Sequence, residues 1–485
     1  MNVANRKPAL SVQLFESRDM LSVSSLWFSG SMLVVKTDAL STSVEVQQSG
    51  SNYKIVESGT GRSWSYAASS VSQVEFQGGS GNDKFVNMVS TLAVRAFGNG
   101  GNDYLEGWNG ADYFSGGAGN DTLVGYGGND SLWGGTGEDV LRGMDGNDQL
   151  TGEDGHDRLN GGDGRDSLWG GYGDDVLIAL DSGTTDYLQG DGGRDAFWVD
   201  RNGTVNDSIY GAAANDRLQA VSSFANGADR TLNGDRIVDP LVESEQSYRT
   251  FSNLPLFSNS GPKAADIRQG DLADCYFLAG LGAVAYDSPH AIRQNIVDFD
   301  DGTYGVRYGN SFYRVDNDLP VTGTATTPAY AGLGDQSSMW AAIAEKAFAH
   351  YRRGQNSYAS IEWGNGTEAS RALGSTTAGE KSFTGYGSAA AMASDVYSRW
   401  NTYQAVTISF HGEKTAGSGT APVIAGHVYI VMSVARNSAG AVTSITLRNP
   451  WGVDGAGNDG NNDGLITLTP TQMWQYSASV NWGRV

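Results

Sequence analysis

A nine-residue repeat constrains this chain more than any other feature of its sequence. Nine copies follow one another without a gap from Gly98 to Ile178, beginning with GNGGNDYLE and ending with GGYGDDVLI. The first and fourth positions are glycine in every copy, the sixth is Asp, and the eighth is Leu or, once, Phe114. Because a glycine-rich linker has no reason to keep three residue types in one phase, the repeat predicts stacked, regular structure.

Each copy predicts one short strand and one tight turn. Glycine permits the positive φ that such a turn needs, and the apolar eighth residue then points inward from the strand. Two copies make one coil, so the Asp residues stack in two ladders. One ladder holds Asp103, Asp121, Asp139, Asp157 and Asp175, and the other holds Asp112, Asp130, Asp148 and Asp166. Carboxylates about 4.8 Å apart repel one another, whereas Ca²⁺ takes six to eight oxygen ligands. The ladders therefore predict several bound calcium ions.

This unit resembles the RTX, or hemolysin-type, calcium-binding nonapeptide repeat. The resemblance implies an all-β parallel β-roll in the N-terminal half, and the changes in composition along the chain predict its neighbours. Imperfect copies, GGSGNDKFV and GDGGRDAFW, flank the array and are expected to act as its ends. We expect an N-terminal segment (1–24), a β-solenoid cap (25–95), the β-roll (96–178), degenerate repeats that cap it (179–245), a linker (246–257) and a second domain (258–485).

The charge and the single cysteine exclude several classes of protein. The chain has 54 acidic and 32 basic residues among 485, a formal charge of −22, which argues against nucleic acid or an anionic membrane as partner and favours bound cations. With one cysteine, no intrachain disulfide can form. No apolar run is long enough to span a membrane. Near the start, LFESRDMLS resembles a short motif of planctomycete surface and secreted proteins, which favours export.

The second half changes to a mixture of helical and strand-like patterns. ADCYFLAGLGAVAYD and SSMWAAIAEKAFAHYRR have helical spacing, and HVYIVMSVAR and SITLRN alternate like strands, which indicates an α+β domain. Cys275 begins the first helix, where the helix dipole favours a thiolate. A cysteine nucleophile needs a base and a group that orients the base. His427 opens one strand and Asn449 ends the next, so a hairpin would place them together.

Five stretches in this half resemble, in the same order, the calpain branch of the papain-like cysteine peptidases. They are RQGDLADCYFLA, YRVDNDLPV, MWAAIAEKAFAHY, GHVYIV and RNPWG. The resemblance implies a two-lobe fold for 258–485, with Cys275 as nucleophile, His427 as general base and Asn449 as the residue that orients it. It also implies that Gln269 donates to the oxyanion hole. Trp451 of RNPWG would lie over the cleft and shield the bond between Asn449 and His427.

The same resemblance implies one or two calcium sites in the second domain. Asp266 and Glu345 match family ligand positions, and Gly261 offers a carbonyl oxygen. Glu345 has an alternative as a helix-surface partner of a neighbouring base. The spacing after RNPWG departs from the family, so Asp454, Asp459 and Asp463 are only substitutes for a second site. Ala273 and Tyr276 stand where the family usually has Gly and Trp, and we expect altered packing there.

Together these features predict a secreted or cell-surface, monomeric, calcium-dependent cysteine endopeptidase that acts on proteins or peptides. Two alternatives stay open. One is a calcium-binding surface or matrix-binding protein whose peptidase fold is vestigial. The other is a peptidase that cleaves its own linker near 246–257.

Overall fold

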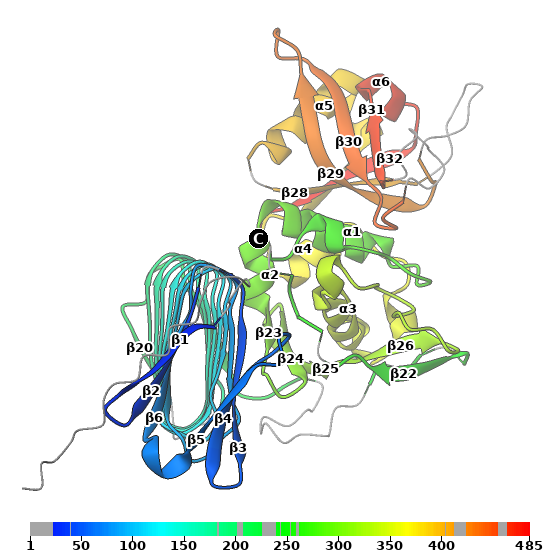
Figure 1. Cartoon of the computed structure of the whole chain (residues 1–485). Helices are drawn as coiled ribbons and strands as arrows, with labels where there is room; N and C mark the ends of the chain where they lie inside the picture. The colour runs from blue at the N-terminus through cyan, green and yellow to red at the C-terminus, as the bar shows by residue number, and fades with distance from the viewer. Residues whose placement is uncertain are drawn as a thin grey trace, which may run out of the picture. The chain divides into compact units, whose positions relative to one another are not determined.

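The chain folds into two compact units that divide between Ser222 and Ser223 (Figure 1). The computed structural model describes residues 23–38, 40–181, 184–200, 207–225, 239–242, 244–252, 254–258, 261–402, 404–411, 423–453 and 463–485. Within these ranges, no helix has both the length and the apolar character needed to cross a membrane.

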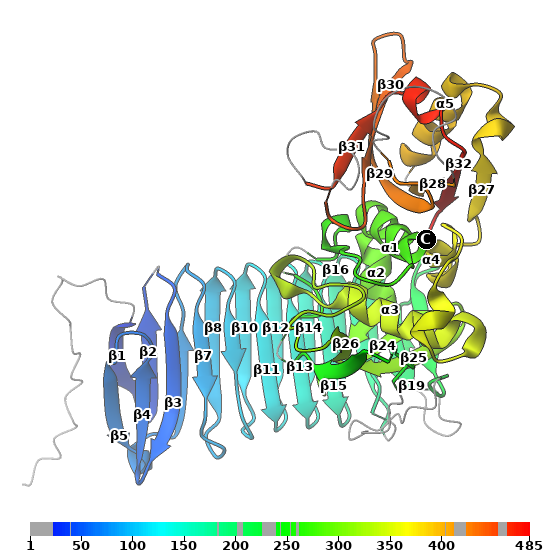
Figure 2. The same ribbon diagram turned by 90° about the vertical axis from the view of Figure 1, so that its right-hand side faces the viewer.

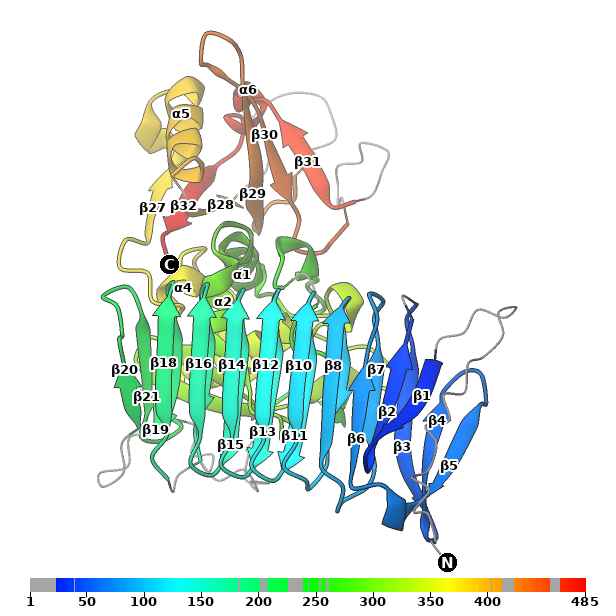
Figure 3. The ribbon, with the colours of Figure 1, turned by 60° about the vertical axis from the view of Figure 1, so that its left-hand side comes forward.

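The first unit is a parallel β-solenoid whose strands alternate between two sheets (Figures 2 and 3). One sheet holds β6 (Gln73–Gln77), β8 (Val94–Gly100), β10 (Tyr113–Ala118), β12 (Ser131–Thr136), β14 (Gln149–Asp154), β16 (Ser167–Tyr172), β18 (Tyr187–Gly192) and β20 (Ser208–Tyr210). The other holds β7 (Lys84–Asn87), β9 (Tyr104–Glu106), β11 (Thr122–Gly127), β13 (Val140–Asp145), β15 (Arg158–Asp163), β17 (Val176–Ala179), β19 (Ala196–Asp200) and β21 (Arg217–Val221). The predicted solenoid is therefore confirmed.

The eighth residue of each repeat builds the core between the sheets. Leu123 pairs with Leu141 on one sheet, and Leu132 pairs with Leu150 on the other, each pair one coil apart. All four are fully buried. Since each leucine contacts the equivalent leucine of the next coil, the core repeats with the sequence.

The solenoid extends beyond the nine strict repeats at both ends. It already begins at β6, and it continues through β21, in 179–245. At its N-terminal end the chain forms antiparallel hairpins from β1 (Val23–Ser29), β2 (Met32–Thr37), β3 (Ser43–Ser49), β4 (Asn52–Glu57) and β5 (Ser63–Ala67). β2 pairs in parallel with β6, and β3 with β7, so these hairpins join both sheets.

The segment expected to be a linker, 246–257, instead belongs to the second unit. β22 (Gln246–Thr250) pairs antiparallel with β26 (Asp318–Thr322). Phe251 and Leu256 are buried in the core of this unit, and Tyr248 packs against it. The expectation differs from the structure because Ser, Asn and Pro, which favour turns, stand among the apolar residues of this segment, and these include Leu254 and Phe257 at the edge of the core.

The first lobe of the second unit is mainly helical and carries the candidate nucleophile. It contains α1 (Cys275–Asp287), α2 (Pro289–Asn295), α3 (Trp340–Tyr351), α4 (Glu368–Ala372) and a sheet of β23 (Ile296–Asp298), β24 (Thr303–Tyr308) and β25 (Ser311–Asp316). Phe277 of α1 stacks on Phe348 of α3 with ring centroids 3.8 Å apart. This packing fixes α1 in the centre of the lobe.

The second lobe is an antiparallel sheet covered by α5 (Ala389–Trp400) and α6 (Pro470–Met473) (Figure 1). Its strand order is β27 (Gly379–Ser382), β32 (Ala478–Gly483), β28 (Ala405–Phe410), β29 (His427–Arg436), β30 (Val442–Arg448) and β31 (Leu465–Leu468). Val428 and Ile430 of β29 belong to the core of the first lobe. The two lobes therefore meet along α1 and β29, which confirms the predicted α+β, two-lobe class.

Candidate active site and calcium ladders

His427 and Asn449 are joined across the hairpin of β29 and β30. The register pairs Ile430 with Arg448, which brings the first residue of β29 close to the residue that follows β30. His427 Nε2 lies 2.9 Å from Asn449 Oδ1. Asn449 is fully buried, its Oδ1 also accepts from the Trp451 N–H, and its Nδ2 donates to the Val453 carbonyl. Both amide atoms of Asn449 are thus held, and they orient the imidazole.

Cys275 lies at the first turn of α1, beside Val428, the residue that follows His427. The backbone N–H of Val428 donates to its sulfur. No hydrogen bond joins Cys275 to His427 in the described part of the chain. Burial raises the pKa of Cys275 to about 11, and burial lowers the pKa of His427 to about 4 against the opposing hydrogen bond to Asn449. At Cys275, desolvation outweighs the backbone hydrogen bonds of Val428 and Tyr276, which lower its pKa, and so this arrangement favours a neutral thiol beside a neutral imidazole.

Trp451 lies against the imidazole of His427. The two ring centroids are 4.7 Å apart, and Trp451 is 39% exposed. The indole therefore separates His427 from solvent.

Two sets of hydrogen bonds join the lobes next to these residues. The backbone N–H of Gln269 donates to the Pro450 carbonyl at 2.8 Å. Arg448 donates to the carbonyls of Ala264 and Ala265 at 3.2 and 3.3 Å. Segment 264–269 of the first lobe is thus fastened to segment 448–450 of the second.

The side chain of Gln269 is engaged inside its own loop. Its Nε2 donates to the Leu272 carbonyl at 2.6 Å, and its Oε1 is buried without a hydrogen-bond partner. The amide lies in the segment that precedes Cys275, but its donor is occupied by the protein. Before the Gln269 amide can donate to an oxyanion, its hydrogen bond to the Leu272 carbonyl has to break.

The expected calcium ligands of the peptidase domain each have protein donors. Asp266 Oδ2 accepts from the Lys263 N–H and from Trp340 Nε1, and the Gly261 carbonyl accepts from Ser258 Oγ. Glu345 Oε2 accepts from the Ala331 N–H. Asp463 Oδ1 accepts from the Leu465 N–H, whereas Asp454 and Asp459 lie outside the described residues. Asp266 and Glu345 are both buried, which excludes the helix-surface alternative for Glu345.

Asp274 is a site residue that the sequence reasoning missed. It directly precedes Cys275 and is fully buried, with its carboxyl against that of Glu345. Burial raises the pKa of both carboxyls, and the Asp274 carboxylate further raises the pKa of Glu345 and of Cys275. The pair therefore holds a proton at neutral pH. An acidic residue next to the candidate nucleophile was the available signal.

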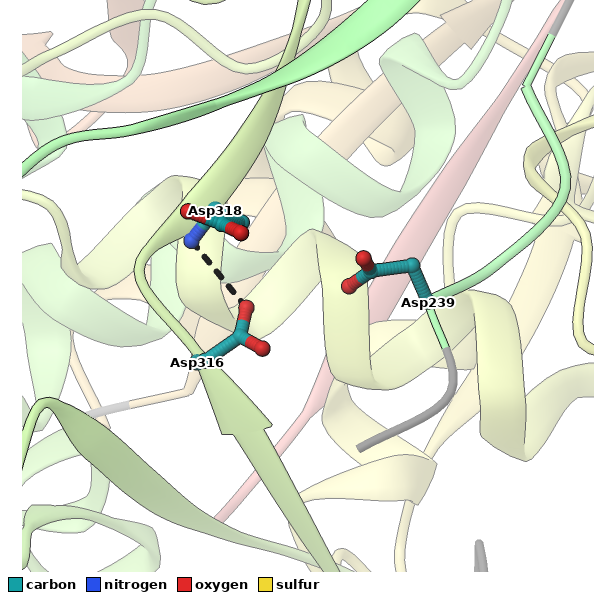
Figure 4. Close-up of side chains that lie close together, drawn as sticks. All are labelled: Asp239, Asp316 and Asp318. Carbon is teal, nitrogen blue, oxygen red and sulfur yellow. Dashed lines mark hydrogen bonds between the residues drawn. The ribbon is translucent and has the colours of Figure 1, made fainter. Parts of the chain in front are cut away.

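Asp239, Asp316 and Asp318 form an acidic group elsewhere in the second unit (Figure 4). The buried ammonium of Lys346 lies 2.5 Å from Asp239 Oδ1 and 2.5 Å from Asp316 Oδ1, and it donates to the Asp318 carbonyl at 2.6 Å. Lys346 thus supplies the positive charge that this group needs, and the cluster is an internal ion pair.

In the solenoid the Asp ladders form as expected, and their geometry fits calcium. The backbone N–H of each Asp donates to Oδ1 of the Asp one coil later, as from Asp121 to Asp139 at 2.7 Å. The other oxygen, Oδ2, is buried without a partner in eight of the nine predicted residues and points at the first glycine of its own repeat, as Asp121 does toward Gly116.

The exception among the nine is Asp112, whose Oδ2 accepts from the Trp108 N–H at 3.3 Å. Burial raises the pKa of the ladder carboxyls to between about 6, at Asp148, and about 9, at Asp157. Rows of buried, unpartnered carboxylate oxygens beside turn carbonyls are a donor set suited to Ca²⁺.

The ladders also include five residues outside the predicted set. Asp83 donates through its N–H to Asp103, while Asp166 and Asp175 donate to Asp186 and Asp195. Asp186 and Asp195 donate in turn to Asp207 and Asp216. A two-residue insertion between Ile178 and Asp186 lengthens the spacing from 18 to 20 residues and takes Asp186 and Asp195 out of the nine-residue phase. The surviving signal was the turn GDGGRD, which keeps Gly190, Gly193 and Asp195.

Comparison with known families agrees with this division of the chain. Residues 245–461 match the family described as calpain family cysteine protease. Residues 95–123, 115–150, 124–159 and 151–181 match the RTX calcium-binding nonapeptide repeat. A search of curated proteins finds no match.

Proposed function

Because residues 245–461 of this chain form a calpain-family cysteine protease domain and residues 95–181 are RTX calcium-binding repeats, we propose that the protein is a calcium-dependent cysteine endopeptidase. The observation that carries the proposal is the hydrogen bond between His427 and Asn449 next to the sulfur of Cys275. Proteins or peptides are the substrates, and the chain acts as a monomer.

The tautomer of the imidazole supports the proposed roles. Asn449 Oδ1 can only accept, so His427 Nε2 carries the hydrogen and Nδ1 keeps the lone pair. Nδ1 then takes the proton of Cys275 as the sulfur attacks the scissile carbonyl, and later delivers it to the leaving amine. The backbone N–H of Cys275, at the first turn of α1, can donate to the oxyanion.

The neutral state of Cys275 and His427 defines what activation must change. A substrate peptide or a shift of Trp451 has to bring the sulfur to Nδ1, and the Gln269 amide has to leave the Leu272 carbonyl. Both changes occur at the junction of 264–269 with 448–450. Calcium held by Asp266, Glu345 and the Gly261 carbonyl would act on the same junction. The reason is that Asp266 directly follows Ala264 and Ala265, whose carbonyls accept hydrogen bonds from Arg448.

In the solenoid, Ca²⁺ would neutralise the Asp ladders, which hold it through the unpartnered oxygens and the turn carbonyls. Millimolar calcium outside cells would fill such sites, so we place the protein in the extracellular space or on the cell surface. The high acidity of the chain agrees with a calcium-rich environment.

The test is digestion of casein by the purified chain with calcium or with chelator. Fragments should form with calcium and disappear in Cys275→Ala, with a loss of about 10⁴-fold or more. A digest that is unchanged by this substitution would reject the proposal.

A calcium-binding surface protein with a vestigial peptidase fold is the second candidate. It is favoured by the missing bond between Cys275 and His427 and by the internal bond of Gln269. This candidate predicts a folded, calcium-binding chain that leaves casein intact. Self-cleavage within 246–257 has weaker support, because β22 is hydrogen-bonded to β26 and Phe251 and Leu256 are buried in the core.

A further inference from the structure

One outer face of the solenoid carries aromatic side chains in two rows. The strands β8, β10, β12, β14, β16, β18 and β20 lie side by side with nearly parallel axes (Figure 3). The eighth residue of each copy points into the core, so the seventh and ninth residues point outward from the same strand. Parallel pairing aligns these outward residues in two rows across the sheet, as it does for Tyr113, Ser131 and Gln149.

Six aromatic rings stand in these rows, in two groups of the same form. The first group is Phe97, Tyr113 and Trp133, and the second is Trp169, Tyr187 and Tyr210. In each group the middle ring lies in one row and its two neighbours lie in the other. Centroids of neighbouring rings are 5.7 and 4.7 Å apart in the first group, and 5.8 and 4.5 Å apart in the second. All six side chains are half-buried or exposed.

The other positions of the two rows are polar but uncharged. From β10 to β20 they are Ser, Thr or Gln. Arg95, at the β8 end, is paired with Glu75 at 3.6 Å. The equivalent rows of the other sheet include Glu106, Arg142 and Arg158, so the repeat does not itself require neutral residues there. A neutral face thus extends over six strands of a chain whose formal charge is −22.

This combination of rings, polar groups and charge fits a neutral polysaccharide. A sugar ring presents C–H groups on its faces, which pack against aromatic rings, and hydroxyls at its rim, which hydrogen-bond to Ser, Thr and Gln. Neighbouring strands lie about 4.8 Å apart, which is close to the advance of one sugar unit along an extended β-linked chain. The acidic protein repels anionic polymers such as nucleic acid or polyuronate, whereas a neutral polymer is not repelled.

We propose that this face of the solenoid binds a neutral, extended polysaccharide that lies across the strands. The two groups of rings contact the same polymer at places four strands, or about 19 Å, apart. The inference goes beyond the proposed peptidase function, and it holds whether or not casein is cleaved, because it uses no residue of the second unit.

The repeat itself supplies variants that remove a ring and keep the coil. Ser115 and Thr151 occupy the same row on the strands to either side of Trp133, so Trp133→Ser should fold. Trp169→Ser removes the corresponding indole of the second group, and Trp133→Tyr keeps a ring. The matched control is Trp108→Ser, which removes a 39% exposed indole that follows β9 of the other sheet.

The experiment measures how the full chain, with calcium, partitions onto insoluble cellulose and chitin, with soluble polygalacturonate as the anionic comparison. The wild type should bind at least one of the two neutral polymers. Trp133→Ser and Trp169→Ser should each weaken this binding about 10-fold, Trp133→Tyr should weaken it less, and Trp108→Ser should leave it unchanged. No binding to either neutral polymer, binding to polygalacturonate alone, or full binding by both Ser variants would overturn the inference.

Two further measurements separate loss of contact from loss of folding or of self-association. A soluble hexasaccharide of the polymer that binds should slow the oxidation of Trp133 and Trp169 by hydroxyl radicals in the wild type, which needs no substitution. Equal oxidation rates with and without this sugar count against the proposed face. Light scattering should show the same mass for wild type and Trp133→Ser, and a dimer that dissociates in Trp133→Ser would instead assign the face to a second copy of the chain.

Discussion

The solenoid and the peptidase unit build their sites in opposite ways. In the solenoid each site uses residues one coil apart, so Asp121 meets Asp139 because the repeat places both on the same edge. In the second unit, His427 and Asn449 join across the hairpin of β29 and β30, whereas Cys275 comes from α1 and reaches their side only when the two lobes pack. Local repetition therefore makes a site robust in position but dependent on metal. Convergence makes a site independent of repetition but sensitive to small movements between lobes.

Removal of calcium should have the largest effect of the changes considered, and it should destabilise the solenoid but not the peptidase unit. Burial raises the folded-state pKa of the ladder carboxyls above the value of about 3.9 in an unfolded chain. Without calcium, this contribution to stability is fully present below about pH 4 and is lost as pH rises through about 6 to 9. With chelator the solenoid should therefore unfold at pH 8 and persist at pH 5.

Calcium should restore the solenoid at pH 8, since each filled site adds about 2.7 kcal/mol at a hundredfold excess over Kd. Hydrogen exchange of peptides from each unit, followed with circular dichroism, checks this. Peptides from α1 and β29 serve as the internal control and should keep their protection. Equal protection of the solenoid with and without calcium at pH 8 would contradict the prediction.

Removal of the group that orients the base comes next in size. Asn449→Ala deletes the acceptor for His427 Nε2, so the imidazole loses its fixed tautomer and orientation. We expect kcat/KM on a peptide substrate to fall by about 10² to 10⁴-fold. Asn401→Ala, at an exposed position after α5, should leave the rate unchanged. A full rate in Asn449→Ala would remove Asn449 from the site.

The junction between the lobes should have a smaller effect. Arg448→Met keeps the apolar stem but removes the donors to Ala264 and Ala265. Hydrogen bonds from a charged donor contribute about 1.5–3 kcal/mol, which predicts a loss of about 10- to 100-fold in kcat with KM less affected.

Arg448→Lys should recover part of the rate. Arg436→Met removes an arginine that donates within its own hairpin, to Gly440, and is the matched control. The role of Arg448 as a clamp is wrong if its loss changes only thermal stability.

The smallest expected effect concerns the ladder carboxylates that follow the insertion between Ile178 and Asp186. Asp195→Asn removes the charge of a ladder carboxyl whose Oδ2 is buried without a partner. It should lower the number of bound calcium ions by one or two, as Asp139→Asn should in the regular array. Calorimetric titration at pH 8 measures this, with the exposed Asp191→Asn of the same turn as control. Unchanged stoichiometry in Asp195→Asn would limit calcium to the strict repeats.

The sequence predicted more of the solenoid than of the peptidase unit. It predicted the inward leucines and the two ladders, because a strict nine-residue phase leaves one way to stack the coils. It did not predict Asp186, whose spacing changed, and it took the copy that holds Asp195 only as an end of the array. It also did not predict the pairing of β22 with β26. In the peptidase unit, motifs identified Cys275, His427 and Asn449, but not the buried neighbour Asp274, because its partner Glu345 is distant in sequence.

The amino-acid sequence by itself determined the solenoid, its inward leucines and the residue types of the candidate catalytic site. Only the tertiary structure decided that desolvation shifts the pKa values of Cys275 and His427 toward their neutral forms, and that Arg448 and Gln269 join the lobes. The reason is physical. Periodic short-range contacts follow from the order of residues, whereas burial, charge state and contacts between distant segments depend on the packing of the whole unit.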